Sequence, residues 1–131
     1  MFMRMNQIID FLNIYPQIKD NKIKISTAYK LSKCFEYCEQ ESKFYTNKIS
    51  EIFKKYGQKD DNGVLKQDAE TKGILIDMAQ KDDCEKEITE LLNLEVPFDE
   101  KLLIDIKDID NFELNMELFR KLKPFLQDND C

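Results

Sequence analysis

Carboxylates three residues apart on a helix are the feature of this sequence that comes nearest to a catalytic site. Glu36 and Glu39 form one such pair, and Glu87 and Glu90 form another. Two pairs on facing helices can hold Mg²⁺ over a nucleoside triphosphate, provided that the carboxylates point inward. Because the chain has 26 acidic residues, such pairs also arise by chance, and Glu36 lies beside the apolar face of its helix. The pairs therefore support an enzymatic function only weakly.

The amino-acid composition further limits which catalytic nucleophiles and metal ligands the chain could supply. Histidine, the commonest general acid–base residue and metal ligand, is absent. The four cysteines are Cys34, Cys38, Cys84 and Cys131. Cys34 and Cys38, four residues apart on one predicted helix, are badly placed for a disulfide, and no C-x-x-C spacing accompanies them. We expect reduced thiols, with Cys34 and Cys38 as small core residues, and no metal, cofactor or catalytic site.

The segment Q-K-D-D-N-G at residues 58–63 could be read as the start of a calcium-binding loop. Asp60 and Asn62 fit positions three and five of an EF-hand, but Gln58 and Ala69 occupy the positions that need carboxylates. The Asn-Gly pair instead predicts a tight hairpin turn, since both central residues of a type I′ turn need positive φ. We therefore expect an exposed tip that could contact a partner. Its candidate contact residues are Asp60, Asp61 and Asn62.

A long helix over residues 26–57 positions most of these groups. Apolar or small residues recur along it with an unbroken 4-3 spacing, which keeps one face, here called the seam, turned toward a partner. Ser26 or Thr27 could cap its start, and Gly57 fits the left-handed conformation that often ends a helix. The seam residues are Leu31, Phe35, Cys38, Ser42, Tyr45, Ile49, Ile52 and Tyr56.

Shorter elements are predicted on both sides of the long helix. Pro16 should end a first helix, because the residue before a proline is pushed away from the α region. A last helix, capped by Asn111, should turn Leu114 or Met116, then Leu118, Phe119 and Leu122, toward the core. The predicted helices cover residues 5–15, 82–96 and 111–123, and the predicted strands cover 22–25, 64–65, 74–76 and 102–106.

The fold class that follows is α+β and mostly helical. We expect one long central helix, a small antiparallel sheet or hairpin, and two or three shorter packing helices. With 131 residues, 42% of them hydrophobic, the chain has the length and composition of a single folded domain. Within it we expect an N-terminal helical extension over residues 1–16, a core over 22–126 and a mobile tail over 127–131.

Charge divides unevenly between the two halves of the sequence. Residues 1–57 have ten basic and six acidic side chains, whereas residues 58–131 have ten and twenty. Such asymmetry affects association more than folding, and the acidic half could steer a basic partner. The two halves could equally neutralise each other. Candidate contact residues in the acidic half are Asp82, Asp83, Glu87 and Glu90.

Aromatic residues alternate with lysines along the long helix, which raises the question of nucleic-acid binding. Three glutamates interrupt any basic track, and the helix has no arginine for bidentate contacts. We therefore expect no direct nucleic-acid binding. Tyr37 and Phe44, seven residues apart and off the seam, could instead form a second apolar stripe for a partner protein or another copy of the chain.

No apolar run is long enough for a signal sequence or a membrane span.

The order of these features resembles a family of small uncharacterised proteins from phages of low-GC Gram-positive bacteria. The likeness rests on the segments K-I-K-I, S-T-A-Y-K-L-S-K, K-K-Y-G-Q-K-D-D-N-G and E-I-T-E-L-L-N-L-E-V, and it covers roughly residues 22–126. Residues up to Pro16 lie outside the family pattern. The family has no assigned catalytic residues, so the resemblance implies a phage origin and a non-enzymatic, partner-binding role.

Three functional hypotheses remain, in order of preference. The first is a phage-encoded accessory protein, not an enzyme, that acts by protein–protein contact with itself or with a virion component. The second is an acidic, anti-defence inhibitor of a host enzyme that processes nucleic acids. The third is a Mg²⁺-dependent nucleoside triphosphate pyrophosphohydrolase. For the first two we expect a location in the cytoplasm of the host cell, or on the virion.

Overall fold

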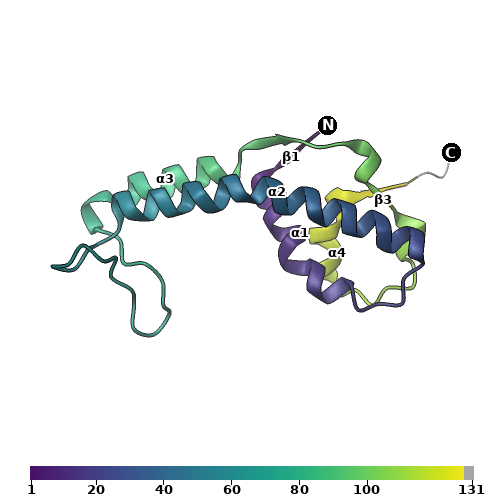
Figure 1. Ribbon diagram of the computed structural model, residues 1–131, viewed down its shortest axis with the longest axis horizontal. Helices are drawn as coiled ribbons and strands as arrows, with labels where there is room; N and C mark the ends of the chain where they lie inside the picture. The colour runs from purple at the N-terminus through teal and green to yellow at the C-terminus, as the bar shows by residue number, and fades with distance from the viewer. Residues whose placement is uncertain (129–131) are drawn as a thin grey trace. The chain divides into compact units, whose positions relative to one another are not determined.

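The computed structural model describes residues 1–128 and has the predicted mostly helical α+β architecture (Figure 1). The expected tail over 127–131 lies largely outside the described residues. The helices are α1 (Met5–Ile18), α2 (Ile25–Tyr56), α3 (Lys81–Leu92) and α4 (Met116–Leu122). The strands are β1 (Phe2–Arg4), β2 (Glu95–Pro97), β3 (Ile104–Asp105) and β4 (Leu126–Gln127). Short 3₁₀ turns connect several of these elements.

Helix α2 confirms the prediction of one long helix with a single apolar face. Every seam residue is buried or half-buried, from Leu31 near its start to Tyr56 at its end. Ser26 and Thr27 do not cap the helix as predicted, because the amide of Ala28 already bonds the carbonyl of Lys24 at 2.8 Å and the helix begins earlier. The seam therefore runs from Leu31 to Tyr56, the last residue of the 32-residue helix.

The chain divides into two compact units, each of which takes part of α2. Unit 1 comprises Met1–Ser42 and Glu95–Cys131, and unit 2 comprises Lys43–Leu94. The single domain over residues 1–131 stays a prediction. Each unit buries its own part of the seam with its own elements, so each is described separately.

Unit 1 is built around aromatic rings supplied by distant parts of the sequence. Phe125 packs against Phe11 of α1, with ring centroids 4.6 Å apart, and against Phe98 at 5.5 Å. Phe35 of α2 stacks on Tyr15 of α1 at 4.3 Å. Strands β1 and β2 pair antiparallel, and β3 and β4 pair parallel. The pairing of β1 with β2 was not predicted, because each strand has only three residues and its partner lies about ninety positions away.

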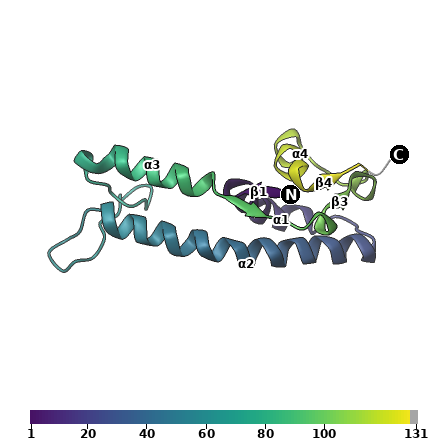
Figure 2. The ribbon, with the colours of Figure 1, turned by 90° about the horizontal axis from the view of Figure 1, so that it is seen from above.

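Unit 2 places α3 alongside the second part of α2, as the two views in Figures 1 and 2 both show. Between them the chain forms an irregular hairpin with antiparallel bridges, among them Lys59 to Leu65 and Gln67 to Ile74. This agrees with the predicted hairpin, although its strands are reduced to isolated bridges. The core of the unit comprises Ile52, Tyr56, Cys84 and Leu91, flanked by Tyr45, Ile49, Ile76 and Ile88.

Two predictions before α2 are wrong, and tertiary packing explains both. Helix α1 continues past Pro16 because Ile18 is fully buried, which holds the last turn in the helix. The proposed strand over residues 22–25 does not form, and the side chain of Asn111 instead donates to the carbonyl of Lys22 at 3.3 Å. Asn111 is therefore not the cap of the last helix. That role belongs to Asn115, whose side chain accepts from the amide of Leu118 at 2.8 Å.

Two predictions about the ends of other elements also need correction. The proposed strand over residues 102–106 shrinks to the two residues of β3. Gly57 is not left-handed, since the glycine with positive φ in the described chain is Gly63. A Cβ on Gly57 would instead collide with the carbonyl oxygen of Phe53 and lie 2.7 Å from Cδ2 of Leu65. Glycine is needed at this position for close packing of the hairpin against the end of α2.

Substituting Gly57 by alanine should therefore destabilise the protein. We expect a loss of about 1–3 kcal/mol in the free energy of unfolding, because a methyl group must be forced into a filled space next to rigid backbone. Urea unfolding followed by circular dichroism measures the change. Gly73→Ala is the matched control, since its Cβ would meet only the Thr71 hydroxyl at 3.4 Å. Equal midpoints for Gly57→Ala and the wild type would contradict the close approach.

Candidate functional site

A groove between α2 and α3 of unit 2 brings together three of the nine predicted contact residues, namely Phe44, Glu87 and Glu90. It has a volume of about 410 Å³ and lies wholly within Lys43–Leu94. We refer to it as the α2–α3 groove. Its lining residues are Phe44, Lys48, Glu51, Ile52, Lys55, Glu87, Glu90, Leu91 and Leu94.

The apolar part of the α2–α3 groove comes from both helices and from the residues that follow α3. Ile52 and Leu91 are buried and belong to the core of the unit. Phe44 and Leu94, by contrast, remain 48% and 40% exposed. Burying such side chains in a partner is favourable, since each removes apolar surface from water. The groove thus offers apolar side chains that the fold has left uncovered.

Charged side chains border the groove, and most of them are already paired. Lys48 lies 3.2 Å from Glu51 and extends over the Phe44 ring at 5.8 Å. Lys55 lies 3.4 Å from Glu87. Glu90 has no ion-pair partner within residues 1–128. After the internal pairs cancel, the groove keeps one negative charge, at Glu90.

Glu87 is the most strongly perturbed carboxylate of the groove. The Tyr56 hydroxyl and the Lys55 ammonium, whose Nζ lies 3.4 Å from Oε1, both favour the charged form of Glu87 and lower its pKa. The same interaction with Glu87 raises the pKa of the Tyr56 phenol. Glu87 therefore links the end of α2 to α3, and its charge is paired with Lys55 within unit 2.

Tyr37, the other predicted aromatic contact residue, contacts residues of unit 1. Its hydroxyl donates to the carbonyl of Pro97, and its ring meets Phe98 edge-on at 5.4 Å. Desolvation by burial is the main reason that the pKa of this phenol is raised. The structure therefore does not present Tyr37 and Phe44 as one exposed stripe.

The predicted acidic contact residues outside the groove have mostly local roles. The Asp60 carboxylate accepts from the amides of Asn62 at 2.8 Å and Val64 at 3.0 Å, which closes the hairpin tip. Asp82 and Asp83 lie in the first turn of α3, where the helix dipole favours negative charge, although the cap itself is Gln80. Asp61 is exposed beside this tip. These residues do not join the groove.

The carboxylate pairs proposed for Mg²⁺ are not assembled into a metal site within either unit. Glu36 is exposed and lies 3.6 Å from Lys33. Glu87 is engaged by Lys55 and Tyr56, so its charge is already balanced. No group of three potential metal-binding His, Cys, Asp or Glu side chains occurs among the residues that the structure describes.

Cys34, Cys38 and Cys84 are buried free thiols, as expected for small core residues. The hydrogen bond with Cys34 and, second, burial raise the pKa of the Cys38 thiol far above its usual range. Thiols of this kind remain protonated at neutral pH and are poor nucleophiles. These three cysteines therefore contribute to packing.

Sequence reasoning missed the exposed surface of α4. Of the predicted alternatives Leu114 and Met116, Leu114 is half-buried and Met116 is 88% exposed. Phe119, predicted to face the core, is 38% exposed, while Leu122 is fully buried as predicted. The helix has only seven residues and starts at Met116 itself. A periodic pattern over two turns does not fix which face is inward, and the cap at Asn115 was the available signal for the helix start.

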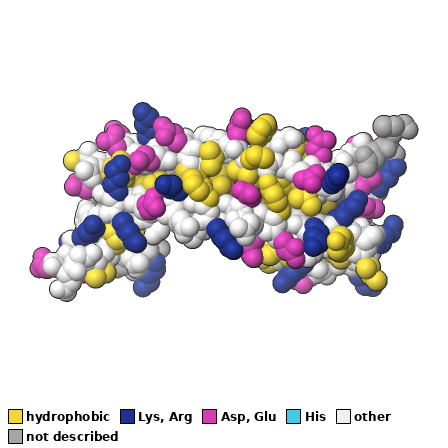
Figure 3. Space-filling view, turned by 45° about the horizontal axis from the view of Figure 1, so that its top comes forward, with side chains coloured by type: hydrophobic (Ala, Val, Ile, Leu, Met, Phe, Trp, Pro, Cys, Tyr) yellow, Lys and Arg dark blue, Asp and Glu magenta, His cyan; other side chains and the backbone are white. Residues whose placement is uncertain are grey.

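Figure 3 shows acidic and basic side chains interspersed on the face that it draws, with exposed apolar side chains between them. None of the helices within residues 1–128 combines the length and hydropathy that crossing a membrane requires.

Comparison of the chain with protein-family models, curated proteins and solved structures finds no match.

Replacing Glu87 by glutamine should change how stability depends on pH. The lowered pKa of Glu87 means that its charge stabilises the folded state above the pKa of an unfolded glutamate, about 4.3, and that this contribution is lost as the pH falls through the lower folded value. Glu87→Gln should therefore be less stable than the wild type at pH 7. It should also lose less stability between pH 5 and pH 3.

Urea midpoints measured across this pH range test the prediction. Glu85→Gln is the matched control, because Glu85 lies on the same helix but outside the groove. The control should follow the wild type. If Glu87→Gln and the wild type lost stability in parallel on acidification, the link between Glu87, Tyr56 and Lys55 would be refuted.

Proposed function

We propose that the protein acts by contact with a protein partner and not by catalysis, and that the α2–α3 groove is the contact site. The observation that carries this proposal is the exposure of Phe44 and Leu94 in a groove whose remaining apolar residues are core. Exposed apolar side chains that gather in one place can mark an interaction site, whereas singly scattered ones are normal. Several carboxylates, by contrast, are engaged in ion pairs or in closing turns, and the thiols of Cys34, Cys38 and Cys84 are buried in the core.

The groove is suited to an amphipathic helix from the partner. Two helices with apolar side chains between them accept a third helix that inserts residues at positions i, i+3 and i+4, which is the helix-in-groove mode of recognition. Glu90 supplies the unpaired charge at the border, so the partner helix should place a lysine or arginine beside its apolar face. We expect this pairing to contribute to specificity and association rate more than to affinity.

The resemblance to small phage proteins directs the search for this partner. It supports a phage-encoded accessory protein whose partner is a virion component or another copy of the chain. The inhibitor hypothesis is less well supported, because several acidic side chains of the second half close turns in their own loops. The pyrophosphohydrolase hypothesis lacks inward-facing carboxylate pairs, since Glu36 and Glu87 are each paired with a lysine.

Selection of a displayed library of helical peptides against the full-length protein tests the proposal. The enriched peptides should carry apolar residues at i, i+3 and i+4 with an adjacent lysine or arginine. Leu94→Asp should weaken their binding by at least about tenfold in fluorescence anisotropy, because it places a charge among the apolar groove residues.

Val64→Asp provides the control for this measurement, since Val64 is 60% exposed on the hairpin outside the groove. It should bind the selected peptides as the wild type does. Failure to enrich any helical peptide, or equal binding by Leu94→Asp, would reject the groove as a protein-binding site.

A further inference from the structure

The exposed surface of α4 is a second place where the fold leaves apolar side chains uncovered. Met116, Phe119, Arg120 and Lys123 share this surface, which we call the α4 face, and their spacing is i, i+3, i+4 and i+7 along the chain. This is the spacing by which a helix presents one stripe to a groove. The surface borders a hollow of about 690 Å³ within unit 1.

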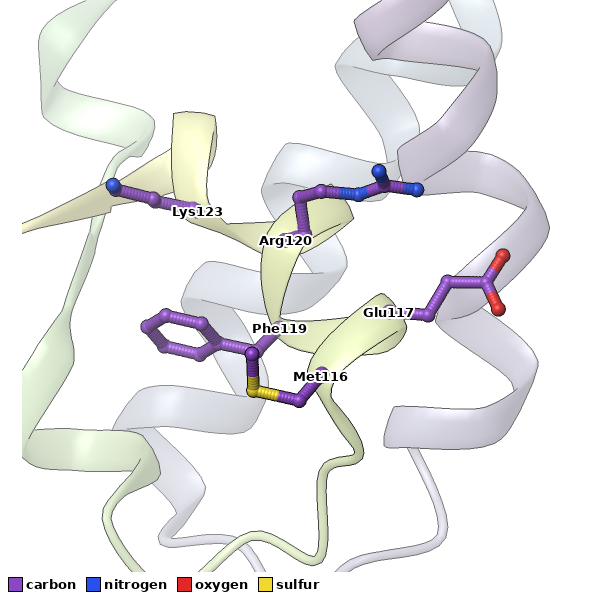
Figure 4. A pocket seen from close by; sticks show the side chains of 5 residues that line it. All are labelled: Met116, Glu117, Phe119, Arg120 and Lys123. Carbon is purple, nitrogen blue, oxygen red and sulfur yellow. The ribbon is translucent and has the colours of Figure 1, made fainter.

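The charge of the α4 face is positive. Glu117 pairs with Lys121 at 3.4 Å, so this acidic residue is neutralised by its own helix. Arg120 and Lys123 have no ion-pair partner in the part of the chain that the structure describes. Figure 4 shows their side chains extending in different directions from the helix, with Phe119 and Met116 at the same pocket. Two cations thus flank an apolar pair.

The α4 face meets two requirements on the partner helix of the α2–α3 groove, apolar residues at i and i+3 and an adjacent cation, although its position i+4 is Arg120 and not an apolar residue. The groove offers the exposed apolar side chains Phe44 and Leu94 and an unpaired carboxylate at Glu90, whereas the α4 face offers Met116 and Phe119 with an unpaired guanidinium at Arg120. We propose that the α4 face of one copy docks into the α2–α3 groove of a second copy. This inference rests on the proposed function and identifies the partner of the groove as the chain itself.

The two docking surfaces are different, so the contact is head-to-tail. Each copy that fills the groove of its neighbour keeps its own groove open for the next copy. A heterologous contact of this kind gives a closed ring if the rotation closes and a filament if it does not. The contact surface on a two-turn helix is small, so the association is weak and depends on concentration.

Charge reversal with a mixing step tests this arrangement. Glu90→Arg places an arginine opposite Arg120 of the next copy, and Arg120→Glu places a glutamate opposite Glu90. Each variant alone should self-associate at least about tenfold more weakly than the wild type in sedimentation velocity over a range of concentrations, since like charges then meet in the contact. Circular dichroism checks that each variant is folded.

Mixing the two variants should restore assembly. Every contact between unlike copies then pairs opposite charges, either the original Glu90 with the original Arg120 or the introduced arginine with the introduced glutamate, so an alternating assembly forms. Added salt should weaken it. Glu85→Arg, on the same helix but outside the groove, changes the net charge by the same amount as Glu90→Arg and should associate as the wild type does.

A wild-type chain that stays monomeric up to about millimolar concentration would overturn the inference, because no head-to-tail contact would then be formed. Unchanged association of Glu90→Arg and Arg120→Glu would also overturn it, as would a mixture no better associated than its components. If selected helical peptides still bound the groove in any of these cases, the proposed function would stand with a different partner. If they did not bind either, both proposals would fail.

Discussion

The apolar seam of α2 is the constraint on which the rest of the structure depends. The apolar face of this 32-residue helix must be covered by other parts of the chain, and each unit covers its own part of the seam with its own elements. Unit 1 covers Leu31, Phe35 and Cys38 with the rings and strands contributed by both ends of the chain. Unit 2 has only α3 and an irregular hairpin with which to cover Tyr45, Ile49, Ile52 and Tyr56. The smaller cover leaves Phe44 and Leu94 uncovered at the border of the core, which is where the groove forms.

The acidity of the second half of the sequence has a local structural explanation. Five aspartates each accept a hydrogen bond from the backbone amide two residues later, the arrangement by which a short carboxylate closes a turn. They are Asp60, Asp68, Asp77, Asp99 and Asp105. At Asp68 the bonds from the amides of Thr71 and Glu70 lower the pKa of the carboxyl, so the turn itself favours the charged form. Charge asymmetry in the sequence therefore need not indicate a charged binding surface.

The sequence predicts the helices better than the strands, for a physical reason. The seam of α2 recurs from Leu31 to Tyr56, so many residues together define its buried face. Helix α3 begins close to the predicted residue but ends at Leu92 and not at residue 96, because Glu95–Pro97 form β2. Strand β1 has three residues, and nothing local marks Val96 as its partner. The sequence could name Phe44, Glu87 and Glu90 as candidate site residues. It could not show that they lie in one groove, because this depends on how α3 packs on α2. Tyr37 and Phe119 show the limit of periodicity. A long-range hydrogen bond engages Tyr37 within unit 1, and Phe119 is 38% exposed although its spacing placed it on the core face.

The most direct test of a contact function is a two-dimensional NMR titration of the ¹⁵N-labelled protein with a helical peptide that carries the α4 sequence M-E-L-F-R-K-L. The account predicts amide shifts concentrated at the groove, near Phe44 and Lys48 on α2 and from Glu87 to Leu94 on and after α3. The shifts should saturate with peptide concentration and disappear in Leu94→Asp. Shifts centred on α1 or the hairpin, or no saturable shifts at millimolar peptide, would contradict it.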